Sequence, residues 1–306
     1  MVRMSQSSIG ERAIRMPAYA RSEWQRRFRL LRRARTALLG AIVLLVLSFV
    51  AITADRIAPY DPNYQVLERR LLPPAWVEGG TPDHLLGTDH LGRDILSRVI
   101  HGSRVSLTVG ILAVAISGIV GVGLGLIAGY YGGRLDAVIM RLVDIQLAFP
   151  FVLLALAVVA VLGAGLRNVI IVLGIGGWMV YARVVRGQVL SIKEKEFIEA
   201  ARAIGVSDLL IILRHILPNT LAPIIIVATF AVATCIITEA SLTFLGVGVE
   251  ARIPTWGSML ADGRAYVGSA WWLTTFPGLA MMVTVLSINM IGDWLRDAFD
   301  PRMRNI

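Results

Sequence analysis

The sequence predicts an all-α polytopic membrane protein with six transmembrane helices. Of its 306 residues, 56% are hydrophobic, which is more than a soluble domain carries. The apolar residues form runs close to the roughly 20 residues that a helix needs to cross a bilayer. The net charge of +9 could indicate nucleic-acid binding, but the cationic residues gather at the ends of the apolar runs. Membrane orientation therefore explains the charge better.

The chain begins with a basic segment, residues 1–35, in which ten residues are arginine. An apolar run over residues 36–54 follows and predicts the first span. A secretory signal is the alternative, but this run exceeds the 7 to 15 apolar residues typical of a signal peptide. We therefore expect an uncleaved anchor that enters the membrane from the cytoplasm.

Residues 55–103 form a polar loop rich in proline and turn-forming residues, expected on the extracytoplasmic side. Its acidic and histidine residues could suggest a metal site; they are Asp83, His84, Asp89, His90 and Asp94. They lack a repeated ligand spacing, and Thr88 and Asp89 suit a turn or a helix cap, so we expect a structural role and no metal. The apolar positions from Ile95 onward predict a helix lying at the membrane interface.

The core, residues 104–293, contains the five remaining predicted spans, before a cytoplasmic tail at 294–306. The spans cover residues 106–130, 137–162, 169–182, 221–242 and 271–291. In the first of these, Gly121, Gly125 and Gly129 recur every four residues, a spacing that lets another helix approach closely. The span at 169–182 is short for a bilayer, but without it the segment that follows would lie outside.

Two spans carry ionisable residues. Arg141 and Asp144 are three residues apart and predict either an ion pair or a functional site, two readings that we weigh equally. Pro150, farther along the same span, should bend it. Glu239 lies near the outer end of the span at 221–242. In the outer segment that follows, residues 254–257 predict a turn.

The segment 193–218 is the polar, sharply patterned stretch between two long apolar ones. Apolar residues recur there with helical spacing, at Phe197, Ala200, Ala201 and Ile204, and predict one sticky face of a short helix. Gly205 suits a left-handed C-cap, and Ser207 an N-cap for a second helix, which Pro218 should end. By periodicity alone, a plain linker between spans is the better-supported reading of this elbow.

The residues favour a more specific interpretation. Glu199-Ala200-Ala201, followed after three residues by Gly205 and later by Leu217-Pro218, resembles the EAA loop of permease subunits in ATP-binding cassette (ABC) importers, although His215 replaces an expected apolar residue. The resemblance implies that the loop fits a groove on an ATPase subunit. The implied coupling residues are Phe197, Glu199, Ala200, Ala201, Gly205, Leu217 and Pro218.

Three further stretches resemble the dipeptide/oligopeptide branch of these binding-protein-dependent inner-membrane components. They are the Gly-Thr-Asp to Gly-Arg-Asp string at 87–94, the Glu-Ala-Ser-Leu stretch at 239–242 and the tail from residue 292, so the likeness runs from about residue 36 to the C-terminus. The candidate motif residues are Asp89, Gly92, Arg93, Asp94, Asp144 and Glu239. The resemblance implies the type I importer (MetI-like) permease fold with a cytoplasmic coupling helix.

The resemblance also implies partners: a second homologous permease, two ATPase subunits and an extracytoplasmic solute-binding protein. ATP and Mg would be bound by the ATPases, with no cofactor in this chain. The implied substrates are di- and oligopeptides; nickel chelates or another small solute are the alternative.

The residues themselves provide no chemistry of catalysis. The chain has no phosphate-binding Gly-x-x-x-x-Gly-Lys-Ser/Thr loop, and its four histidines are scattered, so we expect no enzyme. A secondary transporter or channel is the other class, but it should carry midplane charges and inverted repeats, which are not evident. With six spans, 21 of the 30 Lys and Arg residues lie inside, which predicts an inner-membrane protein with both termini cytoplasmic.

Overall fold

The computed structural model describes residues 18–250 and 252–299, and nearly all regular structure in these ranges is helical. The α-helices are α1 (Ala18–Ile52), α2 (Ala54–Ile57), α3 (Ile95–Tyr131), α4 (Gly133–Leu147), α5 (Phe151–Leu162), α6 (Leu166–Ile192), α7 (Glu196–Ala203), α8 (Asp208–Ile211), α9 (Leu217–Phe244), α10 (Trp256–Gly263) and α11 (Trp272–Phe299). The predicted all-α class is confirmed.

Five helical stretches are long and apolar enough to cross a membrane. They are Arg35–Ile52 within α1, then α3, α6, the continuous stretch Asp208–Phe244, and α11. The helices α4 and α5 meet at 90° and make a sixth span if the bent pair counts as one. The single helix predicted at 137–162 is therefore two helices. Pro150 precedes α5, at the expected position of the bend, because proline lacks an N–H and disfavours helix in the residue before it.

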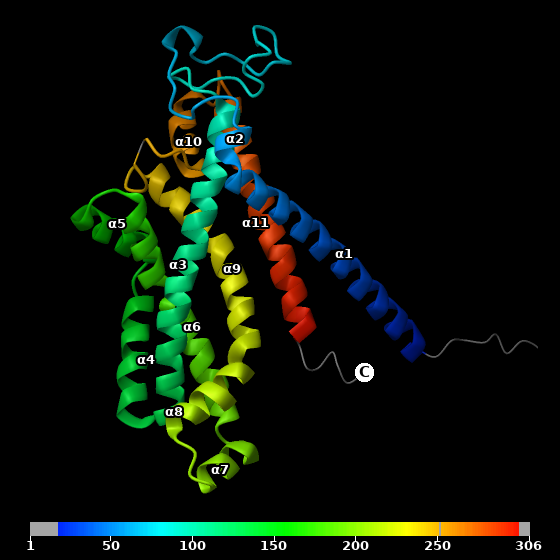
Figure 1. Cartoon of the computed structure of the whole chain (residues 1–306), viewed down its shortest axis with the longest axis vertical. Coiled ribbons are helices and arrows are strands. Elements are labelled where there is room, and N and C mark those ends of the chain that lie inside the picture. The colour runs from blue at the N-terminus through cyan, green and yellow to red at the C-terminus, as the bar shows by residue number, and fades with distance from the viewer. Residues whose placement is uncertain (1–17, 251, 300–306) are drawn as a thin grey trace, which may run out of the picture.

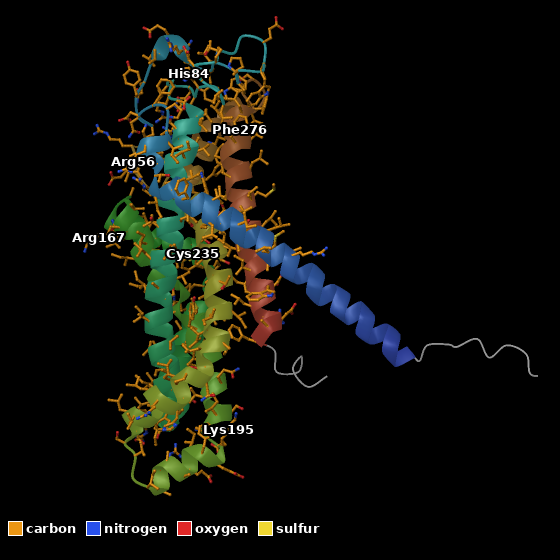
Figure 2. All side chains as sticks on the ribbon, turned by 45° about the vertical axis from the view of Figure 1, so that its right-hand side comes forward. Arg56, His84, Arg167, Lys195, Cys235 and Phe276 are labelled. Atoms are coloured by element: carbon orange, nitrogen blue, oxygen red, sulfur yellow. The ribbon has the colours of Figure 1, made fainter. Side chains whose placement is uncertain are left out.

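The helices run between two polar ends (Figure 1). The loop after α2 gathers at one end with α10, whereas α7 and α8 lie at the other. Figure 2 shows the same separation, with His84 in the loop and Lys195 beside α7. The described ends of α1 and α11 that lead to the two termini point toward the α7 end.

Two predicted boundaries are wrong for physical reasons. The expected interface helix at Ile95 is the first part of α3, and the Ile95 side chain is buried. The short span at 169–182 is the middle of a 27-residue helix, α6, which continues past Arg183 and Arg186. These arginines pair with Asp144 and Asp136 of α4, at 2.6 Å each. The two arginines therefore do not end α6, because each is paired with an aspartate of the neighbouring helix.

The glycine ladder of α3 packs against α6. A Cβ added at Gly125 would lie 2.7 Å from the Ala182 carbonyl oxygen, and one at Gly129 would lie 2.6 Å from the Val189 Cβ. A Cβ at Gly121 would collide with the Trp178 carbonyl oxygen. The small residues therefore bring the two helix backbones together.

The outer segment also differs from prediction at residues 254–257, where a helix begins instead of a turn. Thr255 and Ser258 form a reciprocal capping box at the start of α10. The Trp256 side chain is buried, and its Nε1 donates a hydrogen bond to the Val99 carbonyl oxygen of α3 at 3.1 Å. This contact fixes α10 against the outer part of α3.

Candidate functional site

The first half of the elbow is α7, which ends at a left-handed glycine. Gly205 has φ of +79°. The Gly205 N–H bonds to the Arg202 carbonyl at 2.9 Å, and the Val206 N–H bonds to the Ala201 carbonyl at 3.1 Å. This pair of bonds is a Schellman motif, which requires a residue without a Cβ penalty at its left-handed position. The backbone therefore turns sharply between α7 and α8, as the sequence predicts.

The residues predicted to form one apolar face of α7 lie on two different faces of the helix. Ile198 is fully buried and Ala201 nearly so, and both pack against Val189 and Ile192 of α6 in an apolar cluster. Phe197, by contrast, is 43% exposed. The prediction that Ala201 shares the outward stripe is therefore wrong, because the 198 and 201 positions form the inward face.

An apolar surface remains exposed at this end of the molecule. Phe197, Ala200 and Ile204 lie on it, with Ile204 81% exposed, and Glu199 is exposed beside them. Leu209 and Leu213, after the turn, are also exposed. The end of the molecule that carries α7 and α8 (Figure 1) therefore exposes several large apolar side chains, and such exposed apolar patches are typical of a partner-binding site.

The second half of the elbow does not stop at Pro218, contrary to prediction. The short α8 passes through a π-helical turn, Ile212–Ile216, directly into α9, where Pro218 lies in the first turn. Proline is tolerated in the first turn because its missing N–H has no partner there in any case. Ser207 precedes α8, but its side chain makes no capping bond.

Tyr130 of α3 lies under the elbow and was not predicted to matter. Its hydroxyl donates a hydrogen bond to Asp208 Oδ1 at 2.6 Å. The Arg202 guanidinium lies over the Tyr130 ring, 5.1 Å from its centroid. The interaction of the Arg202 guanidinium with the Tyr130 side chain is the main cause that raises the pKa of Arg202 above its usual range. A tyrosine at the end of a membrane helix is the signal that could have indicated an interfacial role.

The motif residues of the outer loop form a second polar cluster. Arg93 Nε donates to Asp89 Oδ2 at 2.6 Å, and Arg93 Nη2 donates to Asp262 Oδ2 of α10 at 3.0 Å. Arg98 of α3 also reaches Asp262, at 3.4 Å. Asp94 caps α3 by accepting from the Ser97 N–H at 2.8 Å. These bonds fasten the loop to α3 and α10.

Gly92 allows this loop to fold closely on itself. It has φ of +74°, and an added Cβ would collide with the Val66 carbonyl oxygen. The close turn at Gly92 and the hydrogen bonds of Asp89, Arg93 and Asp94 therefore hold this loop in place.

The outer cluster also contains three groups that could ligate a metal: Asp89, His90 and Asp262 lie within 4.8 Å of one another. Both carboxylates are already paired with Arg93 or Arg98. A divalent cation would have to compete with two fixed guanidinium charges. The donor set therefore fits ion pairs, not a metal.

Two motif residues lie within the spans. Asp144 pairs with Arg183 of α6, so the predicted partner, Arg141, is wrong; the true partner is on another helix. Glu239 is fully buried and accepts a hydrogen bond from Thr243 at 2.9 Å. The Thr243 hydroxyl in turn accepts from the Val249 N–H at 3.3 Å. Glu239 thus supports the turn after α9.

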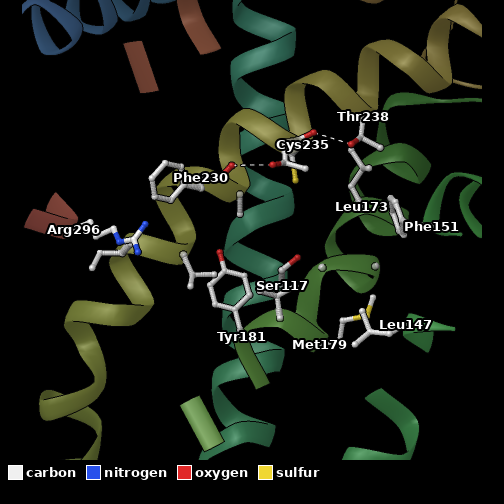
Figure 3. A pocket seen from close by; sticks show the side chains of 17 residues that line it. Ser117, Leu147, Phe151, Leu173, Met179, Tyr181, Phe230, Cys235, Thr238 and Arg296 are labelled. Atoms are coloured by element: carbon white, nitrogen blue, oxygen red, sulfur yellow. Dashed lines mark hydrogen bonds between the residues drawn. The ribbon is translucent and has the colours of Figure 1, made fainter. Parts of the chain in front are cut away.

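A cavity of about 590 Å³ opens between α3, α6 and α9 (Figure 3). Most of its lining is apolar. Among the hydroxyls of the described lining, that of Tyr181 has no hydrogen-bond partner, whereas the others bond within the protein. Ser117 donates to the Gly174 carbonyl at 2.7 Å, and Thr238 to the Thr234 carbonyl at 2.7 Å. Arg296 of α11 is the charged side chain among the described residues of the lining.

Taken together, long spans, a cavity between them and an apolar elbow beyond them define a permease subunit of a transporter. Comparison with known proteins supports this class and identifies the family. The model of the family "Binding-protein-dependent transport system inner membrane component" matches residues 121–305. A second model, the N-terminal TM domain of oligopeptide transport permease C, matches residues 22–74. The chain therefore belongs to the family of binding-protein-dependent transport system inner membrane components.

Full-length relatives agree. The Di/tripeptide transport system permease protein DppC of Pseudomonas aeruginosa is 46% identical over 88% of this chain and 89% of its own length. DppC of Alkalihalophilus pseudofirmus is 45% identical over 93% and 91%. The Glutathione transport system permease protein GsiD of Escherichia coli is 44% identical over 98% and 97%. The similarity to this family thus begins well before residue 36, the position at which the sequence motifs predicted that it would begin.

A chain of the MetNI methionine ABC transporter, solved in inward-facing conformations, shares the fold. Its TM-score is 0.55 at 21% identity, over 66% of this chain and 95% of that one. The chain is therefore a multi-pass inner-membrane permease component of an ABC importer, with the MetI-like fold. Such permeases are non-catalytic subunits without a cofactor, and the secondary-transporter alternative is excluded.

Proposed function

We propose that this chain forms half of the translocation pathway of an importer for di- and oligopeptides. The observation that carries the substrate class is the high identity, over nearly the whole length, to permeases named for di/tripeptides and dipeptides. Identity to a permease named for glutathione favours a second candidate, glutathione itself. Nickel chelates or another small solute remain the third.

The working complex contains three kinds of partner. A second homologous permease completes the pathway, two ATPases bind ATP and Mg, and an extracytoplasmic solute-binding protein delivers the substrate. The test is ATP-driven uptake by the complete transporter in proteoliposomes, with labelled dipeptide, tripeptide, glutathione and nickel chelate compared. Saturable uptake of a dipeptide is expected; uptake of glutathione or nickel alone would refute the peptide assignment.

The elbow docks on an ATPase in this proposal. The exposed Phe197, Glu199 and Ala200 provide the contact surface, and Gly205 sets its direction. The remaining EAA-loop residues support this surface without lying on it. Ala201 packs inward, and Leu217 and Pro218 begin α9. This chain purified alone should hydrolyse no ATP, and robust hydrolysis would contradict the assignment.

Both termini are cytoplasmic in the proposed topology. The charge distribution of the sequence and the direction of α1 and α11 toward the α7 end support it. In a Cys235→Ala background, which removes the chain's one cysteine, we expect Glu78→Cys to react with an impermeant maleimide on whole cells. Glu194→Cys, equally exposed, should react only after lysis; the reverse pattern would overturn the topology.

A further inference from the structure

Tyr130 is the side chain that joins α3 to both halves of the elbow. Its hydroxyl bonds to Asp208, the first residue of α8, and its ring lies beneath Arg202, in the last turn of α7. Gly205 lies between these two contacts. One side chain therefore spans the turn that sets the angle between α7 and α8.

The Schellman bonds at Gly205 shape the turn within the elbow itself, but the other contacts of α7 do not fix the angle at which the elbow meets α3. Ile198 and Ala201 hold the helix against the core by apolar packing, which is non-directional. Ser207 makes no capping bond across the turn. The hydroxyl-to-carboxylate bond from Tyr130 is directional and charge-assisted, and such bonds are the stronger ones. The cation over the ring adds a second directional contact.

The helix that carries Tyr130 is continuous to the opposite end of the molecule. With 37 residues, α3 is about 55 Å long at 1.5 Å per residue. Its first turn is fastened by the Asp94 cap and by Arg98, which pairs with Asp262 of α10. A change in the elbow's angle at Tyr130 therefore acts on the same rigid helix that holds the outer loop.

We propose that Tyr130 is a positioning residue for transport: its hydroxyl, through Asp208, fixes the angle at which the elbow meets α3, so that movement of a docked ATPase is passed to α3. This inference rests on the proposed docking of the elbow. It assigns the coupling to a residue outside the EAA loop itself.

The test compares Tyr130→Phe with Tyr131→Phe in the complete transporter, purified through a tag on this chain. Tyr131 is the adjacent residue, and its side chain is 52% exposed, so its variant is a matched control that loses a hydroxyl from the same helix end. Two variants of the exposed Asp208 complete the set. Asp208→Asn keeps an oxygen that accepts from Tyr130, whereas Asp208→Ala does not.

Two readouts are needed. The ATP hydrolysed per peptide imported reports coupling, and hydrogen exchange of the amides at 204–211 reports how firmly the elbow is held. A lost charge-assisted bond corresponds to about a tenfold change in an equilibrium. We expect Tyr130→Phe and Asp208→Ala to speed this exchange about tenfold and to raise the ATP used per peptide. Tyr131→Phe should match the wild type, and Asp208→Asn, which keeps a neutral bond, should fall between the wild type and Asp208→Ala.

The outcomes separate this inference from the proposed function. If the wild-type complex contains no ATPase or imports nothing, the proposed function fails. If the wild type couples normally and Tyr130→Phe matches Tyr131→Phe, the positioning role of Tyr130 fails alone. Faster exchange with unchanged coupling also overturns it, because the bond would then hold the elbow without serving transport. Should Tyr130→Phe not assemble, the surface variant Asp208→Ala decides the question.

Discussion

Replacing Gly205 by valine tests whether transport needs the elbow's shape or only its presence. The left-handed conformation, φ +79° at Gly205, costs an L-residue about 1 to 2 kcal/mol. No atom lies within 4 Å of an added Cβ, so backbone strain is the whole cost. That strain lowers the population of the observed turn by about five- to thirtyfold relative to its alternatives.

The chain offers a matched control in Gly246. Its φ is +83°, it too has open space around an added Cβ, and it ends α9 with the same pair of bonds: Gly246 N–H to the Thr243 carbonyl at 2.9 Å and Val247 N–H to the Leu242 carbonyl at 3.1 Å. Gly246→Val therefore imposes the same strain at the opposite end of α9. General destabilisation should affect both variants equally.

The assay measures uptake, copurification of the ATPases and stimulated hydrolysis in the same preparations. We expect both variants to insert and express normally. Gly205→Val should lose uptake by about the factor given above, with ATPases released or hydrolysing without transport, whereas Gly246→Val should keep its ATPases. Equal losses in the two variants, or wild-type uptake by Gly205→Val, would refute the reasoning.

Two further predictions concern the elbow's charge and the helix interface. Glu199→Lys should insert normally but copurify less ATPase, because it reverses an exposed charge on the proposed docking surface; unchanged copurification would exclude Glu199 from the contact. Gly125→Val should lower the thermal unfolding temperature, since its Cβ would lie 2.7 Å from the Ala182 carbonyl oxygen, whereas Gly123→Val meets nothing within 4 Å. Equal unfolding temperatures for these two variants would show that the interface yields more easily than the packing indicates.

Properties that depend on the residues of one segment could be predicted from the sequence. Apolar run length predicted the membrane class, and the position of Gly205 predicted a left-handed turn that the structure contains. Proline at 150 predicted the break before α5. Each of these depends on backbone chemistry or transfer free energy, which act within a few neighbouring residues.

Properties that depend on two distant segments could not be predicted. Asp144 has Arg141 three residues away, yet its partner is Arg183, 39 positions later. Pro218 looks like a helix end, but the π-helical turn before it lets α8 continue into α9. Tyr130 and Asp208 are 78 positions apart, and no spacing rule connects them. The contacts of the motif residues, and the role of Tyr130, therefore required the structure.

The cavity wall bears on where a peptide importer selects its substrate. The hydroxyls of Ser117 and Thr238 bond to carbonyls of the protein's own helices, so among the hydroxyls of the described lining only that of Tyr181 is left without a partner. Peptides share a polar backbone and differ in their side chains. A site that binds and discriminates among them needs directional partners for the backbone and for the differing side chains. A largely apolar wall, with Arg296 as its charge and Tyr181 as its unpartnered hydroxyl among the described lining residues, offers few directional contacts. In the proposed importer, selection therefore belongs to the solute-binding protein, and this chain supplies passage and coupling.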